Sequence, residues 1–230
     1  MSPDQDTSTL SQEQIARMVD LSAVRADSSE AEVRTLARMA RAYGCACASA
    51  LPCFTPLLVE LLCSQMDTRV GGNVGFPSGG STTVVKVAEA REFVNAGCGE
   101  LDMVLAIGML RSGRDAYVLD DMLAVIEAAD GVPVKVILEC HYLSQDQIRR
   151  ACAMAVEAGA AFVKTSTGWA PTGATLENIA LIKSCVGDSV GIKAAGGIRS
   201  LETIREMYQL GARRFGLGLR SAPLILDPST

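Results

Sequence analysis

The chain has 230 residues, of which 49% are hydrophobic and 20% are charged, and its formal net charge is −5. This size fits one sizeable globular domain or two small ones, and a negative charge without a basic patch disfavours nucleic-acid binding. No apolar run is long enough to cross a membrane. Aromatic residues make up only 4% of the chain, so the core must be aliphatic, as in barrels and doubly wound sheets covered by helices.

The first predicted elements are a short helix and a short strand. Residues 1–10 are polar, and we expect them to be disordered. They lack a hydrophobic signal region, so we expect a cytoplasmic protein. The segment 11–14 resembles a capping box that opens a helix through about residue 19. A strand is expected at 20–24, and the helix after it ends at Gly44.

From Gly44 onward one unit recurs, made of an apolar strand, a loop with glycine or hydroxyl residues, and a helix. The remaining strands are expected at about 45–51, 70–74, 100–106, 134–139, 161–164, 190–194 and 213–217. The helices between them are expected at about 55–64, 83–96, 116–129, 145–158, 176–186 and 201–210. Gly97, Gly159 and Gly211 each fit a left-handed helix terminus just before a strand.

Eight strands that alternate with helices, without a linker or a break in composition, predict a single parallel (β/α)8 TIM barrel over residues 11–230. The alternative is an open doubly wound sheet, but its G-x-G-x-x-G fingerprint after the first strand is missing. Two prolines interrupt the short segment after Ser221. We therefore expect the last helix of the barrel to be truncated.

The eight cysteines and the single histidine, His141, do not predict a metal site. None of the cysteines forms a Cys-x-x-Cys pair, and Cys45 and Cys47 are too close together for a common zinc spacing. Buried, reduced thiols in a cytosolic protein are the simplest explanation. His141 is interpreted as a loop residue.

Charged and hydroxyl residues lie at the expected carboxyl ends of the strands, where TIM barrels place their active sites. Each residue alone has a structural explanation: a lysine can extend its amine to water, and an acid can cap a loop or pair a buried charge. Several buried charges at one end of one barrel are nevertheless costly unless they form a working site. These residues are Asp20, Ser22, Asp102, Glu139, Lys164 and Lys193. Glu139 alone is also read as a residue of the rim.

Amine catalysis is the chemistry that these residue types suggest. A neutral lysine can attack a carbonyl and form a Schiff base, which stabilises an adjacent carbanion equivalent. A second lysine nearby disfavours protonation of the first, and a carboxylate such as Asp102 can transfer protons. This chemistry needs no metal and no organic cofactor.

Two glycine loops predict a phosphate site. Residues 195–199 follow the seventh strand and residues 215–221 follow the eighth, and each loop contains an arginine. Barrels commonly hold a phosphate on these loops through backbone N–H groups, although the glycines could serve only as tight turns. The segment 75–77 is expected to be a rigid turn, and Trp169 either packs on the rim or forms a wall of the pocket.

The motifs Phe162–Gly168, Gly191–Arg199, Glu100–Val104 and Gly75–Pro77 together resemble the class I deoxyribose-phosphate aldolases, over about residues 19–218. The resemblance implies a TIM barrel that reversibly cleaves 2-deoxy-D-ribose 5-phosphate to acetaldehyde and glyceraldehyde 3-phosphate. It also implies roles for particular residues. Lys164 would form the Schiff base, Lys193 would be the second lysine that perturbs Lys164, and Asp102 would belong to the proton relay. The substrate hydroxyls would meet Asp20, Ser22 and Thr167. The phosphate would meet the glycines of the loops, namely Gly168, Gly196, Gly197 and Gly216.

The chain departs from the family pattern at Gly218, where the family usually has a phosphate-binding serine. Arg220 or Ser221 could replace that hydroxyl donor. This departure makes a paralogous Schiff-base lyase that acts on a modified or unphosphorylated aldehyde an alternative. A separate alternative is a barrel that binds a sugar phosphate without catalysis. The truncated last helix would leave apolar barrel wall uncovered, so a homo-oligomer is a further expectation.

Overall fold

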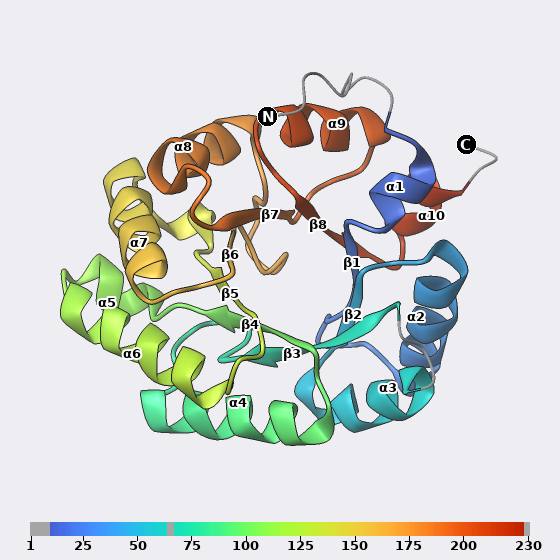
Figure 1. The fold of residues 1–230 in the computed structure, drawn as a ribbon, viewed down its shortest axis with the longest axis horizontal. Helices are drawn as coiled ribbons and strands as arrows, with labels where there is room; N and C mark the ends of the chain where they lie inside the picture. Colours follow the sequence, from blue (N-terminus) through green and yellow to red (C-terminus); the bar gives the residue numbers. More distant parts are fainter. Residues whose placement is uncertain (1–9, 64–66, 228–230) are drawn as a thin grey trace.

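The computed structural model of the chain describes residues 10–63 and 67–227. Eight parallel strands close into a barrel in the order of the sequence, with the first strand paired to the last (Figure 1). The strands are β1 (Val19–Ala23), β2 (Cys47–Ala50), β3 (Arg69–Val74), β4 (Glu100–Val104), β5 (Val134–Ile137), β6 (Phe162–Lys164), β7 (Gly191–Ala195) and β8 (Arg214–Gly218). The predicted TIM barrel is therefore confirmed. The disorder expected for residues 1–10 falls, except for Leu10, outside the described residues.

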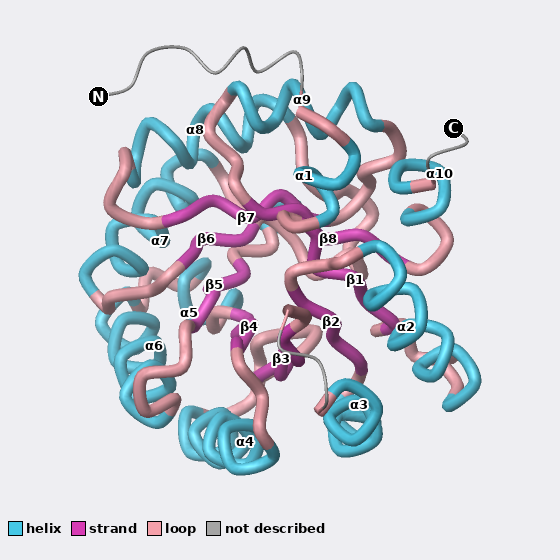
Figure 2. Tube along the Cα trace, turned by 45° about the vertical axis from the view of Figure 1, so that its right-hand side comes forward, coloured by secondary structure: helices cyan, strands magenta, loops and turns pink. Residues whose placement is uncertain are grey.

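Helices form a ring around the strands (Figure 2). They are α1 (Gln12–Ala16), α2 (Glu30–Tyr43), α3 (Thr55–Leu62), α4 (Thr83–Ala96), α5 (Ile107–Arg111), α6 (Asp115–Ala128), α7 (Gln145–Glu157), α8 (Leu176–Val186), α9 (Leu201–Gln209) and α10 (Ala222–Leu226). The last helix has only five residues, as the two prolines predicted. Within the described residues, no helix combines the length and the apolar character that a membrane span requires.

Helix α2 shows how local sequence sets these boundaries. Ser29 accepts a hydrogen bond from the Glu32 backbone, and the Glu32 side chain accepts one from the Ser29 backbone, so a capping box begins the helix. Gly44 ends it in the left-handed conformation, with φ of 67°. Its apolar face, which includes the fully buried Val33 and Leu36, packs against the barrel. The main hydrophobic layer of the protein lies between the helices and the strands, as it does beneath α2.

Three predicted strands were too long by at least two residues. Strand β2 spans Cys47–Ala50 rather than 45–51. Strand β4 ends at Val104 rather than at residue 106, because Ala106 is the N-cap of the unpredicted helix α5. Strand β5 ends at Ile137 rather than at residue 139, because Glu139 has a left-handed backbone with φ of 55° and begins the 3-10 turn Cys140–Tyr142. A non-glycine residue in this region is uncommon and is often found at functional sites.

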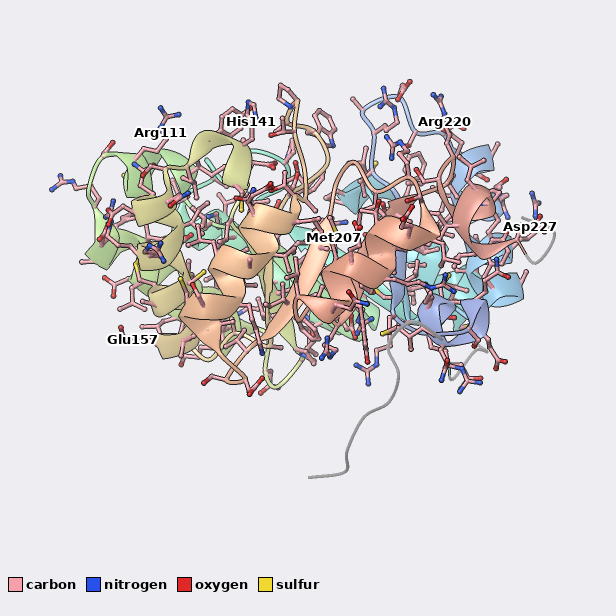
Figure 3. All side chains as sticks on the ribbon, turned by 90° about the horizontal axis from the view of Figure 1, so that it is seen from above. Arg111, His141, Glu157, Met207, Arg220 and Asp227 are labelled. Carbon is pink, nitrogen blue, oxygen red and sulfur yellow. The ribbon has the colours of Figure 1, made fainter. Side chains whose placement is uncertain are left out.

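The carboxyl ends of the strands and the loops that follow them form one face of the barrel. In Figure 3, His141 and Arg220, which follow β5 and β8, lie along one edge of the molecule, and Glu157, which precedes β6, lies along the opposite edge. The polar strand ends singled out from the sequence therefore converge on the face that carries His141 and Arg220.

Candidate active site

Strand register places the charged residues of the site next to one another. Lys164 on β6 lies opposite Lys193 on β7, and Asp102 on β4 lies opposite Lys135 on β5. All four side chains are at least nine-tenths buried. The interior of this barrel is therefore charged at the level where β4 to β7 meet, whereas most TIM barrels fill this space with branched aliphatic residues.

Asp102 is the centre of the cluster. Its Oδ2 atom accepts hydrogen bonds from Lys164 Nζ at 2.7 Å and from Lys193 Nζ at 2.6 Å. Its Oδ1 atom accepts a hydrogen bond from Lys135 Nζ at 2.9 Å. One carboxylate thus contacts three lysines, and a single oxygen links the two lysines that the sequence singled out.

A second layer of ion pairs holds this cluster in place. Lys193 Nζ lies 2.5 Å from Asp20 Oδ2, and Lys135 Nζ lies 2.5 Å from Glu100 Oε2. The guanidinium of Arg214 bridges the two acids, with 2.7 Å to Asp20 Oδ1 and 2.7 Å to Glu100 Oε1. Such a network fixes the directions of the amines, since each buried charge must be compensated.

Charge counting indicates that one cationic group of the buried cluster can lose its proton. Three carboxylates, those of Asp20, Glu100 and Asp102, face four cationic groups, those of Lys135, Lys164, Lys193 and Arg214. Arg69 also contacts Glu100, but more than half of its side chain is exposed, so solvent screens its charge. The buried cluster balances when one of the four groups loses its proton.

The pKa values identify Lys164 as that group. Burial lowers the pKa of Lys164, Asp102 opposes this effect, and the positive charge of Lys193 adds to it, so the pKa is about 8. Burial also disfavours the charged form of Lys193, but Asp102 and Asp20 outweigh it and raise the pKa of Lys193. The two neighbouring lysines therefore differ: Lys193 stays charged, and Lys164 readily becomes neutral.

Asp20 and Asp102 stay ionised. Burial alone would raise the pKa of Asp20, but Lys193, Lys135 and Arg214 together lower it to about 2. The pKa of Asp102 also lies well below its usual range, because the three lysines outweigh the effect of burial.

A cavity of about 270 Å³ opens above the two lysines. Lys164 and Lys193 line its floor, and Asp102 lies behind them with its contacts to their Nζ atoms. The other predicted substrate-binding residues all line the cavity: Asp20, Ser22, Thr167, Gly168, Gly196, Gly197, Gly216 and Gly218. The structure thus brings together residues from five strands and their loops.

One end of the cavity is built from the loops that follow β1, β7 and β8. Arg25, Arg199 and Arg220 line it. Arg199 donates a hydrogen bond to Ser221 Oγ at 2.9 Å. Arg220 is exposed, and among the described residues its guanidinium has no carboxylate partner. This end therefore offers positive charge and the backbone of the glycine loops.

Glu139 is not a residue of the rim, contrary to that part of the prediction. Only 2% of it is exposed, and its carboxylate accepts hydrogen bonds from the backbone N–H of Thr167, at 3.2 Å, and from the Thr167 hydroxyl. Glu139 therefore positions the loop that follows Lys164. Its left-handed backbone, which ends β5 early, turns the side chain toward this loop.

Sequence reasoning missed three members of the charged cluster: Lys135, Glu100 and Arg214. Each lies inside or at the start of a strand rather than at its carboxyl end. One signal for Glu100 was available in the sequence. Glu100 and Asp102 are two residues apart in one strand, so their charged side chains point to the same side of β4. Ser49 and Asn73, which line the cavity from β2 and β3, were also missed.

The cluster does not fit a metal ion. Ligand atoms of Asp20, Cys47 and Glu100 lie within 4.8 Å of one another. Both carboxylates, however, already bind lysine and arginine side chains. Burial also raises the pKa of the Cys47 thiol well above its usual value, whereas metal binding requires the thiolate.

Fold and site together define a TIM-barrel protein with a lysine-centred site. The sequence matches the family of DeoC/LacD aldolases over residues 15–219. The deoxyribose-phosphate aldolase of Klebsiella pneumoniae subsp. pneumoniae is 52% identical over 204 residues, which cover 88% of this chain and 82% of the relative. That of Sinorhizobium medicae is 50% identical over 214 residues, with 93% and 86% covered.

A solved structure agrees with this assignment. The tetrameric deoxyribose phosphate aldolase from Aeropyrum pernix is 30% identical and superimposes with a TM-score of 0.86, over 94% of this chain and 91% of that chain. The chain belongs to the DeoC/LacD family of aldolases and is therefore a lyase. The family resemblance read from the two lysine motifs is confirmed.

Proposed function

We propose that this aldolase reversibly cleaves 2-deoxy-D-ribose 5-phosphate to acetaldehyde and glyceraldehyde 3-phosphate through a Schiff base on Lys164. The observation that carries this proposal is the Lys164 amine, which lies on the cavity floor with a pKa of about 8 beside a charged Lys193. A neutral amine is the nucleophile that carbonyl chemistry requires. The names of the relatives supply the substrate.

The proposed reaction begins with attack of Lys164 Nζ on the C1 carbonyl of the open-chain sugar. Loss of water from the resulting carbinolamine gives an iminium ion. A base then removes the proton from the C3 hydroxyl, the C2–C3 bond breaks, and its electron pair passes into the iminium to give an enamine. Glyceraldehyde 3-phosphate leaves, a proton adds to C2, and water hydrolyses the new iminium to acetaldehyde and the free amine.

Asp102 and Lys193 are proposed to support these proton transfers. Asp102 Oδ2 contacts both amine nitrogens, so it links the group that loses protons to the one that keeps them. Asp20, which contacts Lys193 and lines the cavity, and Ser22 and Thr167, which line it as well, are proposed to meet the substrate hydroxyls. A positioned proton donor or acceptor typically contributes about 10²- to 10⁴-fold to a rate.

The loop end of the cavity is proposed to hold the phosphate. The backbone N–H groups of Gly196 and Gly197 supply neutral donors. Gly168 and Gly216 line the cavity, but the Gly168 N–H already donates to Ser166 Oγ, and Gly216 is paired with β1 and β7 inside strand β8. Arg220, which lines this end without an anionic partner among the described residues, supplies a charge in place of the hydroxyl that Gly218 lacks.

Reductive trapping tests the mechanism. Borohydride added with acetaldehyde should reduce the Schiff base and leave a covalent ethyl adduct on Lys164, located by peptide mass spectrometry. The Lys164→Arg variant serves as the control and should carry no adduct in this peptide. An adduct on Lys193 instead, or on no lysine, would contradict the mechanism. Binding of the sugar phosphate without adduct or turnover would favour the non-catalytic barrel.

A panel of acceptor aldehydes with and without a phosphate tests the substrate. We expect turnover to fall at least about tenfold when the phosphate is removed, since charged hydrogen bonds contribute most of the binding at this end. Equal turnover of both forms would identify the alternative, a lyase for unphosphorylated aldehydes.

We also propose that the enzyme acts in the cytoplasm as a homo-oligomer. Support for the assembly comes from the tetrameric relative of Aeropyrum pernix and from large apolar side chains that are exposed on α4 and α10, namely Val84 at 80% and Leu224 at 60%. Light scattering coupled to size-exclusion chromatography should give a mass of at least twice 24.2 kDa. A monomer at micromolar concentration would contradict this.

A further inference from the structure

Trp169 is held across the mouth of the cavity by three contacts. Its indole Nε1 donates a hydrogen bond to the backbone carbonyl of Val24 at 2.8 Å. Its ring meets the ring of Phe76 edge to face, with 6.1 Å between centroids and an interplanar angle of 85°. Its own backbone N–H donates to Thr167 Oγ1 at 3.0 Å. The three loops involved follow β1, β3 and β6.

These loops come from separate parts of the barrel rim. In the ring of strands, β6 and β1 are separated by β7 and β8, and β3 and β6 by β4 and β5. The indole therefore bridges the mouth rather than packing on one side of it. Val24, Phe76 and Trp169 all line the cavity, while 45% of Trp169 remains exposed. One part of the side chain thus covers the cavity and another part meets solvent.

From this geometry we propose that Trp169 is a specificity-determining residue, which limits the width of the acceptor aldehydes that reach Lys164. The inference rests on the proposed aldolase function. A ring fixed by a hydrogen bond and an edge contact yields little to a wide substrate. Straight-chain acceptors pass beneath it, whereas a branch next to the carbonyl meets the ring. The bond to Val24 requires an indole N–H, which phenylalanine and tyrosine rings lack.

The test compares two aldehydes with equal numbers of carbon atoms, butanal and 2-methylpropanal, as acceptors for acetaldehyde. The quantity measured is the ratio of kcat/KM for the branched to the straight acceptor. We expect Trp169→Ala to raise this ratio about fivefold or more, since a difference of one methyl group in an apolar pocket gives about 10- to 200-fold discrimination. Trp169→Phe keeps most of the ring and loses the bond, so its ratio should rise about two- to fivefold.

Tyr142→Ala is the matched control. Tyr142 is also an aromatic residue on the loop face, is 44% exposed and does not line the cavity. Its removal should leave the ratio within twofold of the wild type. A ratio in Trp169→Ala that moves no further than in this control overturns the proposal, and if that variant does not fold, the ratio in Trp169→Phe decides.

Fluorescence provides a second readout, because Trp169 is the single tryptophan of the chain. Titration of the wild type with glyceraldehyde 3-phosphate should change its emission, and an unchanged emission at saturation would contradict a place over the substrate. Borohydride trapping in each variant separates the two proposals. A Lys164 adduct with an unmoved ratio rejects only the role of Trp169, whereas no adduct in the wild type rejects the aldolase mechanism and this inference with it.

Discussion

The two ends of the cavity are built on different principles. The amine end consists of strand residues whose charges are buried and paired, as for Lys164 and Lys193 on Asp102. The opposite end consists of loops, with backbone N–H groups and the exposed Arg220. Fixed charges in a medium of low dielectric constant can shift a pKa by several units, whereas exposed charges cannot. The chemistry therefore resides in the barrel, and recognition resides in loops that can vary.

A second buried lysine shows what sets Lys164 apart. Lys86 on α4 is fully buried, and its Nζ contacts Asp121 Oδ2 at 2.5 Å and the Val104 carbonyl at 3.0 Å. It has one carboxylate of its own and does not line the cavity that Lys164 lines. Lys164 shares its carboxylate with two other lysines and opens into the cavity. Burial alone thus marks a structural ion pair, and competition for one carboxylate marks the candidate nucleophile.

Replacement of Lys164 should have the largest effect on activity. We expect Lys164→Ala to reduce kcat about 10⁴-fold or more, because the covalent route is lost entirely. Removal of one cation from the cluster leaves three cations for three carboxylates, so the fold should tolerate the change. Steady-state kinetics and thermal unfolding monitored by circular dichroism check both statements. A loss of less than about tenfold in a folded variant would remove Lys164 from the mechanism.

Replacement of Lys86 should affect stability instead. Lys86→Met leaves the Asp121 carboxylate buried, with the Thr83 hydroxyl as its remaining partner at 2.8 Å. We expect a loss of about 3–5 kcal/mol in the free energy of unfolding, and a kcat within about threefold of the wild type. Denaturant unfolding gives the first value and kinetics the second. The double variant Lys86→Met/Asp121→Leu is the control, and should recover most of the lost stability because no unpaired charge remains.

The pH dependence should distinguish Lys164 from its neighbour. Since attack requires the neutral amine, kcat/KM should fall about tenfold for each pH unit below the Lys164 pKa of about 8, and level off above it. Removal of the positive charge in Lys193→Met raises the pKa of Lys164, because Lys193 lowers it in the wild type. The rising limb of the profile should therefore move to higher pH. A limb that stays in place or moves to lower pH would show that Lys193 does not tune the nucleophile.

Much of this architecture follows from sequence periodicity. The predicted bounds of α4 and α8 agree with the structure, because polar caps and glycines mark their ends. The convergence of Asp102, Lys164 and Lys193 followed from the barrel rule that the carboxyl ends of strands share one face. Lys135 could not be found in this way. A lysine in the middle of a strand points inward or outward according to register, and only the pairing of Lys135 with Asp102 settles its direction.

Loop conformation accounts for the rest of what the sequence left open. The strand predicted for β5 extends to Glu139, but the structure ends it at Ile137. The left-handed backbone of Glu139 then directs its carboxylate to Thr167. The choice between rim packing and a pocket wall for Trp169 depended on the β1 loop, since Val24 lies 145 residues away in sequence. Contacts of this range depend on the closed barrel and are not local properties of the sequence.

The smallest predicted effect lies at the loop end, where Gly218 can be changed without disturbing the fold. A Cβ atom at this position meets no heavy atom within 4 Å, and Gly218 is not among the glycines with positive φ. Gly218→Ser should add a hydroxyl donor and lower KM for 2-deoxy-D-ribose 5-phosphate about three- to tenfold, with kcat changed less than twofold, as one hydrogen bond to a charged group predicts. Gly218→Ala, which adds the Cβ atom without the hydroxyl, is the control and should leave KM unchanged. If the serine and alanine variants have the same KM, Arg220 and the glycine loops already satisfy the phosphate. If the serine variant lowers KM equally for unphosphorylated aldehydes, the added hydroxyl does not meet the phosphate.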